Sequence, residues 1–261
     1  MMDPSVQAEI QARLKALEAE HDIRVVYACE SGSRAWGFAS TDSDYDVRFL
    51  YAHPQAWYLS LDLQRRSDTL DVPITDDLDL HGWDVRKALQ LFRKSNPPLL
   101  EWLQSPTVYR EDTAVMERWR ALLPTYYTPI AAGYHYLHMA QGNYKDYLKG
   151  ADRIWTKKYL YVLRPLLGIR WIERKDAPVP MEFARLVDAG VDRDDLRDAI
   201  DRLLTRKRSG EERDEGPRLP VIHAFIEDEL DRLQDTHFAS PDGAKPLEPL
   251  NAFFRDIVCR T

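Results

Sequence analysis

The residue pattern changes its period near residue 84, and this change constrains the fold more than any other feature of the chain. Before it stand four apolar, β-branched runs of strand length, separated by turn residues, at 23–29, 45–51, 68–72 and 77–83. After it, apolar residues recur at helical spacing, and from about Thr125 nearly the whole chain follows that pattern. Strands followed by a run of helices predict an α+β fold.

This division predicts two domains, one with the sheet over 1–122 and an all-helical one over 123–261. An amphipathic helix over 4–20 is expected to precede the first strand. The charged stretch 209–217 is expected to be an exposed loop. In the second domain we expect helices at 130–149, 153–175, 180–189, 192–208, 218–236 and 246–258.

The composition excludes several classes of protein. No apolar run approaches the ~20 residues that a membrane helix needs, so we expect no membrane contact. Cys29 and Cys259 stand at opposite ends of the chain without metal-ligand spacing, which favours two free thiols in a reducing cytoplasm. The formal net charge of −7 argues against non-specific coating of nucleic acid, although it leaves room for a local basic groove.

The stretch from Gly32 to Val47 (GSRAWGFASTDSDYDV) carries the chemistry that the sequence suggests. Gly32 lets the backbone turn sharply after a strand, and the amides and side chains of Ser33 and Arg34 then open a helical turn suited to phosphate. Asp44 and Asp46 stand two residues apart at the start of the next strand, so their side chains share one face. Paired carboxylates with oxygen-only donors predict a Mg²⁺ site, with Mn²⁺ as a substitute.

A third carboxylate is expected from a neighbouring strand. The segment DLDLHGW offers Asp77 and Asp79, which share a face while the leucines point the other way. We prefer Asp79 because it lies deeper in the apolar run, and Asp77 remains the alternative.

The expected helix over 153–175 is strongly basic, with Glu173 as its single acid. At 3.6 residues per turn, a stripe along it contains Arg153, Lys157, Tyr161 and Arg164, with Lys158 beside it. Such a stripe could bind a triphosphate and stack a base, so we predict nucleotide contacts from Lys157, Lys158, Tyr161 and Arg164. The alternative is an ordinary solvated face.

The order Gly-Ser, one helical turn, Ser-Asp-x-Asp resembles the signature of the DNA polymerase β-like nucleotidyltransferases. More closely, the chain resembles the bacterial and phage YcgL or RlaP branch, which is associated with RNA repair. Four blocks carry this resemblance over most of 30–175: GSRAWGFASTDSDYDVRFLY (32–51), DLHGWDVRKAL (79–89), KSNPPLLEWL (94–103) and KKYLYVLRPLLGIRWIE (157–173).

The resemblance implies a small mixed sheet with flanking helices, three metal-binding carboxylates, and transfer of a nucleotidyl group from an NTP. Asp44 and Asp46 match the first two carboxylates of the superfamily, and Asp79 matches the third. The expected reaction moves an NMP to an acceptor hydroxyl, at the 3′ end of a tRNA or a damaged RNA, and releases pyrophosphate. The helical domain would bind the substrate.

Three other functions share parts of this pattern. A nucleotide-sugar glycosyltransferase also uses Asp-x-Asp, but typically after a longer nucleotide-binding sheet. A nucleotide-binding sensor without catalysis would not need Ser33, Asp44 and Asp46 intact. An enzyme that nucleotidylates a protein partner, as a toxin or antitoxin would, remains an alternative, although it would not require so many Lys and Arg residues near the NTP site.

Overall fold

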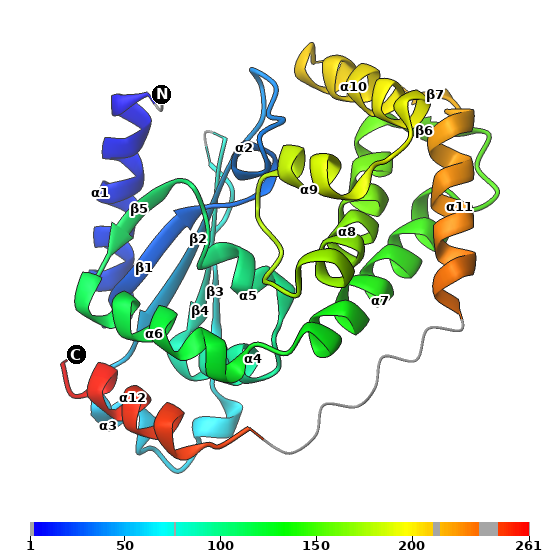
Figure 1. Ribbon diagram of the computed structural model, residues 1–261. Coiled ribbons are helices and arrows are strands. Elements are labelled where there is room, and N and C mark those ends of the chain that lie inside the picture. Colours follow the sequence, from blue (N-terminus) through cyan, green and yellow to red (C-terminus); the bar gives the residue numbers. More distant parts are fainter. Residues whose placement is uncertain (1–2, 76, 211–214, 235–244, 261) are drawn as a thin grey trace.

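The computed structural model describes residues 3–75, 77–210, 215–234 and 245–260 (Figure 1). The strands are β1 (Arg24–Glu30), β2 (Tyr45–Ala52), β3 (Thr69–Asp71), β4 (Leu78–Asp84), β5 (Val108–Glu111), β6 (Arg153–Trp155) and β7 (Glu215–Pro217). The helices before residue 150 are α1 (Pro4–His21), α2 (Gly32–Trp36), α3 (Gln55–Tyr58), η1 (Leu63–Arg65), α4 (Val85–Arg93), α5 (Pro97–Trp102), α6 (Thr113–Tyr126) and α7 (Pro129–Tyr147). The later helices are α8 (Thr156–Lys175), α9 (Phe183–Gly190), α10 (Asp194–Arg208), α11 (Pro220–Gln234) and α12 (Glu248–Val258).

The main sheet has five strands in the order β3-β4-β2-β1-β5. β2 and β4 run parallel, and every other neighbouring pair is antiparallel. The sheet is therefore mixed, and the expected α+β class is confirmed. The parallel pair matters for function, because its register places Asp46 directly beside Asp79.

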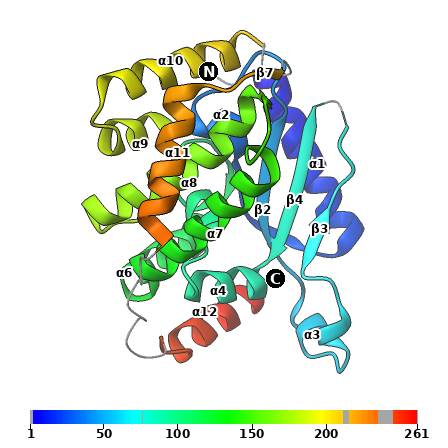
Figure 2. The same cartoon turned by 90° about the vertical axis from the view of Figure 1, so that its right-hand side faces the viewer.

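The side chains of β2 and β4 alternate between two helical layers, as the period of a strand requires. Val47, Phe49 and Leu80 pack against α1 on one face. The opposite face carries Leu50 and Ala52, which pack with residues of α4, α5, α6 and α12. Figures 1 and 2 show α1 on one side of the sheet and the later helices on the other. By the same alternation, Asp46 and Asp79 point toward the side of the later helices.

The helical part is built around α8, which is buried along most of its length. It packs against α7, α9, α10 and α11, and together they enclose a second apolar core. Phe38, from the loop after α2, is a member of this core and stacks edge-on against Phe183. The loop that leads to the acidic motif is therefore anchored in the helical part.

Several boundaries differ from those expected. The helix expected over 153–175 begins at Thr156, because 153–155 form β6, which pairs with β7. β7 also occupies the end of the expected loop 209–217, of which 211–214 lie outside the described residues. The helix expected over 218–236 is described as 220–234, and its last two expected residues lie outside the described part.

The predicted boundary between residues 122 and 123 falls inside α6. The last helix, α12, packs back on α4, and Leu250, Phe253 and Ile257 join the core on that face of the sheet. The division at 122 stays a prediction, with the addition that α12 contacts the sheet-containing part. Within the described ranges, every helix is too short or too polar to cross a bilayer.

Candidate active site

Asp46 is held against the backbone of Gly32, at the point where β1 leads into α2. Gly32 has a φ of +56°, and a Cβ atom at this position would lie 1.7 Å from Oδ2 of Asp46. Only glycine leaves room for the carboxylate there, since an L side chain would also be strained at this φ. Asp44 stands just before β2, is exposed, and lines the same pocket as Asp46.

The third predicted carboxylate, Asp79, lies next to Asp46 across the parallel strand pair. One nitrogen of Arg48, Nη2, is 2.8 Å from Oδ1 of Asp46 and 2.8 Å from Oδ2 of Asp79. The two carboxylates therefore share one hydrogen-bond donor and lie close together. Asp77, the alternative, is exposed with a φ of 62°, and its carbonyl accepts from the amide of Tyr45. The geometry favours Asp79.

We expect Asp79→Asn to lower the rate of nucleotidyl transfer by about a hundredfold while changing NTP affinity less than about threefold. Asp79 lies beside Asp46 but does not line the pocket, so it would act on the reacting hydroxyl rather than on the bound nucleotide. Single-turnover rates and equilibrium NTP binding separate the two effects. Asp77→Asn is the matched control. If Asp77→Asn is the crippled variant and Asp79→Asn is normal, the assignment is wrong.

Buried groups hold the backbone of Asp46, and its surroundings shift the pKa of its carboxyl. The amide of Asp46 donates to Oε1 of Glu30 at 2.9 Å, and its carbonyl accepts from the amide of Ser31. Tyr109 donates a short hydrogen bond to the other oxygen of Glu30. Burial raises the pKa of Glu30 to about 7. Burial also raises the pKa of Asp46, Arg48 opposes this rise, and the neighbouring charges of Asp79 and Asp44 add to it.

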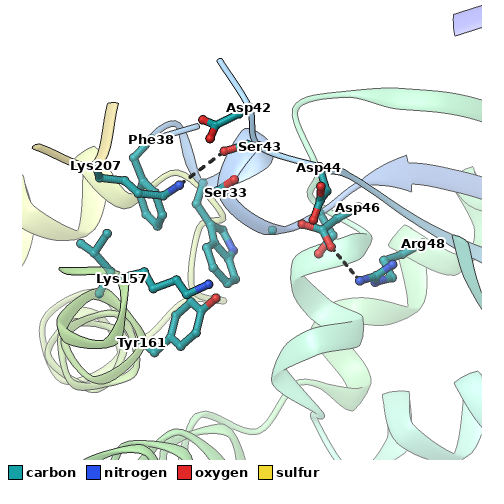
Figure 3. A pocket seen from close by; sticks show the side chains of 14 residues that line it. Ser33, Phe38, Asp42, Ser43, Asp44, Asp46, Arg48, Lys157, Tyr161 and Lys207 are labelled. Carbon is teal, nitrogen blue, oxygen red and sulfur yellow. Dashed lines mark hydrogen bonds and ion pairs between the residues drawn. The ribbon is translucent and has the colours of Figure 1, made fainter. Parts of the chain in front are cut away.

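A pocket of about 390 Å³ opens over Asp44 and Asp46. Figure 3 shows the acidic residues and Arg48 on one side, and Lys157, Tyr161 and Lys207 on the other. Asp46 comes from β2 and Asp44 from the residue just before this strand, whereas the two lysines and the tyrosine come from α8 and α10. The residues that line the pocket are Ser31, Gly32, Ser33, Trp36, Phe38, Asp42, Ser43, Asp44, Asp46, Arg48, Lys157, Leu160, Tyr161 and Lys207.

Lys207 is a site residue that the sequence pattern did not reveal. It stands near the end of α10 with only 4% of its surface exposed, and Nζ donates to the hydroxyls of Ser40 and Ser43 at 3.3 and 3.4 Å. Its neighbour Arg208 donates to the carbonyl of Gly37. The end of α10 therefore holds the loop that carries the acidic motif. No motif marks Lys207, because it reaches the pocket only through the packing of α10.

Four of the predicted nucleotide contacts line the pocket, namely Gly32, Ser33, Lys157 and Tyr161. Lys158 lies outside it, with Nζ 3.5 Å from the ring centre of Tyr147. Arg34 does not line it either. Its guanidinium donates to the carbonyls of Ser43 and Asp44 and lies over the ring of Tyr45. Arg34 therefore braces the loop before β2.

The structure corrects the placement of Arg164. Its side chain is buried and forms an ion pair of 2.7 Å with Glu101 of α5, and it also lies over the ring of Trp36. Residues 157 and 164 share a stripe but are separated by about 10.5 Å along the helix axis, so only Lys157 reaches the pocket. Arg153, the other end of the predicted stripe, belongs to β6.

The donor set suits a hard divalent cation, since carboxylates supply only oxygen. The charges of Asp79 and Asp44 both act to raise the pKa of Asp46, and a divalent cation bound there would counteract this rise. Among the described residues, however, no three acidic, histidine or cysteine side chains are already gathered as a metal-ligand group. Arg48 stands between Asp46 and Asp79 instead. The residues fit a cation if Arg48 yields its place.

A family model for RlaP, described as the RNA repair pathway DNA polymerase beta family, matches residues 6–256. The chain belongs to the RlaP family. The match spans the sheet, the acidic motif, both lysines of the pocket and most of α12, so all parts of the candidate site fall within it.

Two known proteins are similar to this RlaP-family chain. "Uncharacterized protein YcgL" of Bacillus subtilis is 49% identical over 222 residues, which cover 85% of this chain and 84% of that protein. A crystal structure of a nucleotidyltransferase-like protein from Exiguobacterium sibiricum aligns over 96% of this chain and 90% of its own, with 12% identity and a TM-score of 0.34. The low TM-score gives the second likeness no weight.

Membership in the RlaP family confirms the expectation of a polymerase β-like nucleotidyltransferase. It makes the protein a transferase by family. The individual site residues, the metal and the acceptor remain predictions that rest on the geometry of the pocket.

Proposed function

We propose that this protein transfers an NMP from an NTP to a hydroxyl at the 3′ end of an RNA, with Asp44, Asp46 and Asp79 holding divalent cations. One observation supports this most directly. Carboxylates of the sheet and lysines of the helical part face each other across one pocket of about 390 Å³. A triphosphate–metal substrate needs both kinds of charge, acids for the cations and lysines for the phosphates.

Each side of the pocket has a distinct role in this proposal. The lysines Lys157 and Lys207, with the hydroxyls of Ser33 and Ser43, would bind the phosphates. Tyr161 offers a ring on which a base could stack. Bound Mg²⁺, for which Mn²⁺ could substitute, would neutralise charge on the triphosphate and activate the acceptor hydroxyl. The side chains themselves would contribute chiefly by orienting the NTP.

An RNA acceptor is supported by the family description and by the charge distribution. The description of the RlaP family names an RNA repair pathway. The chain has a net charge of −7, yet α10 ends in Arg206, Lys207 and Arg208, next to the pocket. A basic edge on an acidic protein would guide a polyanion to one place and repel it elsewhere. With a tRNA or a damaged RNA as acceptor, the cytoplasm is the expected location.

We expect Lys157→Gln and Lys207→Gln each to raise the KM for NTP about tenfold, because each removes a charged donor from the pocket. Initial rates over a range of NTP concentrations measure this. Lys158→Gln is the matched control, since the neighbouring lysine lies against Tyr147 outside the pocket and should leave the KM unchanged. Equal effects of all three substitutions would show that the pocket does not determine NTP binding.

The central experiment incubates the purified protein with each α-³²P-labelled NTP and either Mg²⁺ or Mn²⁺. Total RNA and protein extract are supplied as separate acceptors, and Asp44→Asn/Asp46→Asn protein serves as the blank. We expect label in RNA that ribonuclease removes and protease does not. Periodate oxidation of the RNA beforehand should block labelling, because it destroys the terminal diol.

Label that only protease removes would replace the RNA acceptor with a protein partner. Binding of NTP without any labelled product would instead favour the nucleotide sensor. Either result leaves the family assignment intact and overturns the proposed acceptor or the proposed activity.

A further inference from the structure

Arg48 is the cationic group closest to the proposed metal ligands, and the mechanism above gives it no role. It stands two residues after Asp46 on β2, so the two side chains share one face of the sheet. Its Nη2 donates to Asp46 and to Asp79 at 2.8 Å each. Its Nη1 donates to the carbonyl oxygens of Asp79 and Val47. Both strands of the parallel pair therefore hold the guanidinium in place.

One oxygen of Asp46 is bonded to Arg48, and the other packs against the backbone of Gly32. Oδ1 accepts from Arg48, and Oδ2 lies so close to Gly32 that a Cβ atom there would be 1.7 Å away. A cation that binds Oδ1 of Asp46 must therefore compete with Arg48 for that oxygen. The same competition applies at Oδ2 of Asp79, which is bonded to the same nitrogen.

Electrostatics point the same way. A guanidinium and a divalent cation beside one carboxylate repel each other, and at a partly buried site this repulsion weakens the binding of the cation. Arg48 has 17% of its side chain exposed, so solvent screens it only in part. Arg48 also offsets the repulsion between the carboxylates of Asp46 and Asp79, because its Nη2 donates to both of them.

We infer that Arg48 is an internal counter-cation that occupies the space between Asp46 and Asp79 and competes with the divalent metal for them. It keeps the two carboxylates close together in the metal-free protein, so the ligands are positioned before the cation arrives. It also weakens the binding of a cation without nucleotide. This inference rests on the proposed metal site, and it makes Arg48 a positioning residue.

The test measures the affinity of Mn²⁺ for the full-length protein, by calorimetry and by the loss of the EPR signal of free Mn²⁺. Arg48→Gln keeps a hydrogen-bond donor but removes the charge, and it should bind Mn²⁺ about tenfold or more tightly than the wild type. Its Tm should be lower than that of the wild type in EDTA, and saturating Mn²⁺ should reduce that difference. Arg48→Lys keeps the charge but loses the forked donor, so it should bind Mn²⁺ more tightly than the wild type and less tightly than Arg48→Gln.

Arg110→Gln is the matched control. Arg110, on β5 of the same sheet, forms a similar, partly buried ion pair with Glu18 of α1, and neither residue is a proposed ligand. The Arg110→Gln variant should have a lower Tm than the wild type and the same Mn²⁺ affinity. Mn²⁺ affinity in Arg48→Gln that equals or falls below that of the wild type would overturn the inference. If Arg48→Gln does not fold, Arg48→Lys decides the question, because a single ammonium group should hold the two carboxylates less well than the guanidinium does. The Arg48→Lys variant should then bind Mn²⁺ measurably more tightly than the wild type, and an unchanged affinity would overturn the inference.

The same measurements test the metal site separately. The wild type should bind Mn²⁺, and Asp44→Asn/Asp46→Asn should not. If the wild type binds no Mn²⁺, even with a non-hydrolysable NTP analogue present, the proposed metal site itself is wrong. If the wild type binds Mn²⁺ and Arg48→Gln does not bind it more tightly, only the role of Arg48 is wrong.

Discussion

Purified protein carrying Asp44→Asn and Asp46→Asn should transfer nucleotide at least about a thousandfold more slowly than the wild type, while its fold is retained. An amide has the shape of a carboxylate but lacks its charge, so the double variant cannot hold two divalent cations. The transition-state stabilisation that a metal supplies amounts to several kcal/mol, and about 4 kcal/mol corresponds to a factor of a thousand. Single-turnover transfer from labelled NTP measures the loss.

The fold should survive because Arg48 keeps Asp79 as a partner, and the Gly32 backbone accommodates an amide of the same size. A circular dichroism spectrum and a melting curve verify this. Asp42→Asn is the control, since Asp42 lines the same pocket but belongs to the turn before β2 and is not a proposed ligand. The transfer rate of the Asp42→Asn variant should stay within about threefold of the wild-type rate. Near-normal transfer by the folded double variant would refute the assignment of the active site.

The acidic half of the site could be predicted because it depends on local rules. Gly32, Ser33, Asp44 and Asp46 stand within one short stretch, and strand alternation places both aspartates on one face. The same rule places Arg48 on that face, so strand alternation could have identified this residue, although the sequence pattern gave it no role. Asp79 was harder to assign, because its pairing with Asp46 follows from the parallel register of β2 and β4, which the sequence does not state.

The basic half could be predicted only in part because it depends on how helices pack. Lys157 was found from the charge of the α8 stretch, whereas Lys207 stands 50 residues later, on a helix whose placement no local pattern specifies. Helical periodicity described which residues share a stripe, but not which end of the stripe reaches the pocket. Arg164 shares the stripe of Lys157 and contacts a different part of the molecule.

Arg164 links the two parts of the chain through a buried ion pair. Its guanidinium is 2.7 Å from Oε1 of Glu101, and the side chains are only 4% and 7% exposed. The hydroxyl of Tyr136 donates to the same oxygen at 2.6 Å, and Arg164 also donates to the carbonyl of Met181. Glu101 belongs to α5 beside the sheet and Arg164 to α8, so this cluster holds the pocket's two sides in their relative position.

Arg164→Met should therefore lower the free energy of unfolding by about 3–5 kcal/mol, because it leaves the Glu101 carboxylate buried without its cation. Urea unfolding at constant pH measures the change. Adding Glu101→Leu should restore most of the loss, since an apolar pair of similar volume requires no counter-charge. Arg174→Met, on the same helix but in an exposed pair with Asp192, should change the stability little.

The same variant distinguishes a structural role of Arg164 from the predicted nucleotide contact. Well below its unfolding temperature, Arg164→Met should bind NTP within about threefold of the wild type, because the guanidinium does not line the pocket. A large rise in the NTP KM, together with unchanged stability, would return Arg164 to the nucleotide site and contradict the buried pair. Loss of stability that Glu101→Leu fails to rescue would show that Arg164 acts through Trp36 or Met181 rather than through the ion pair.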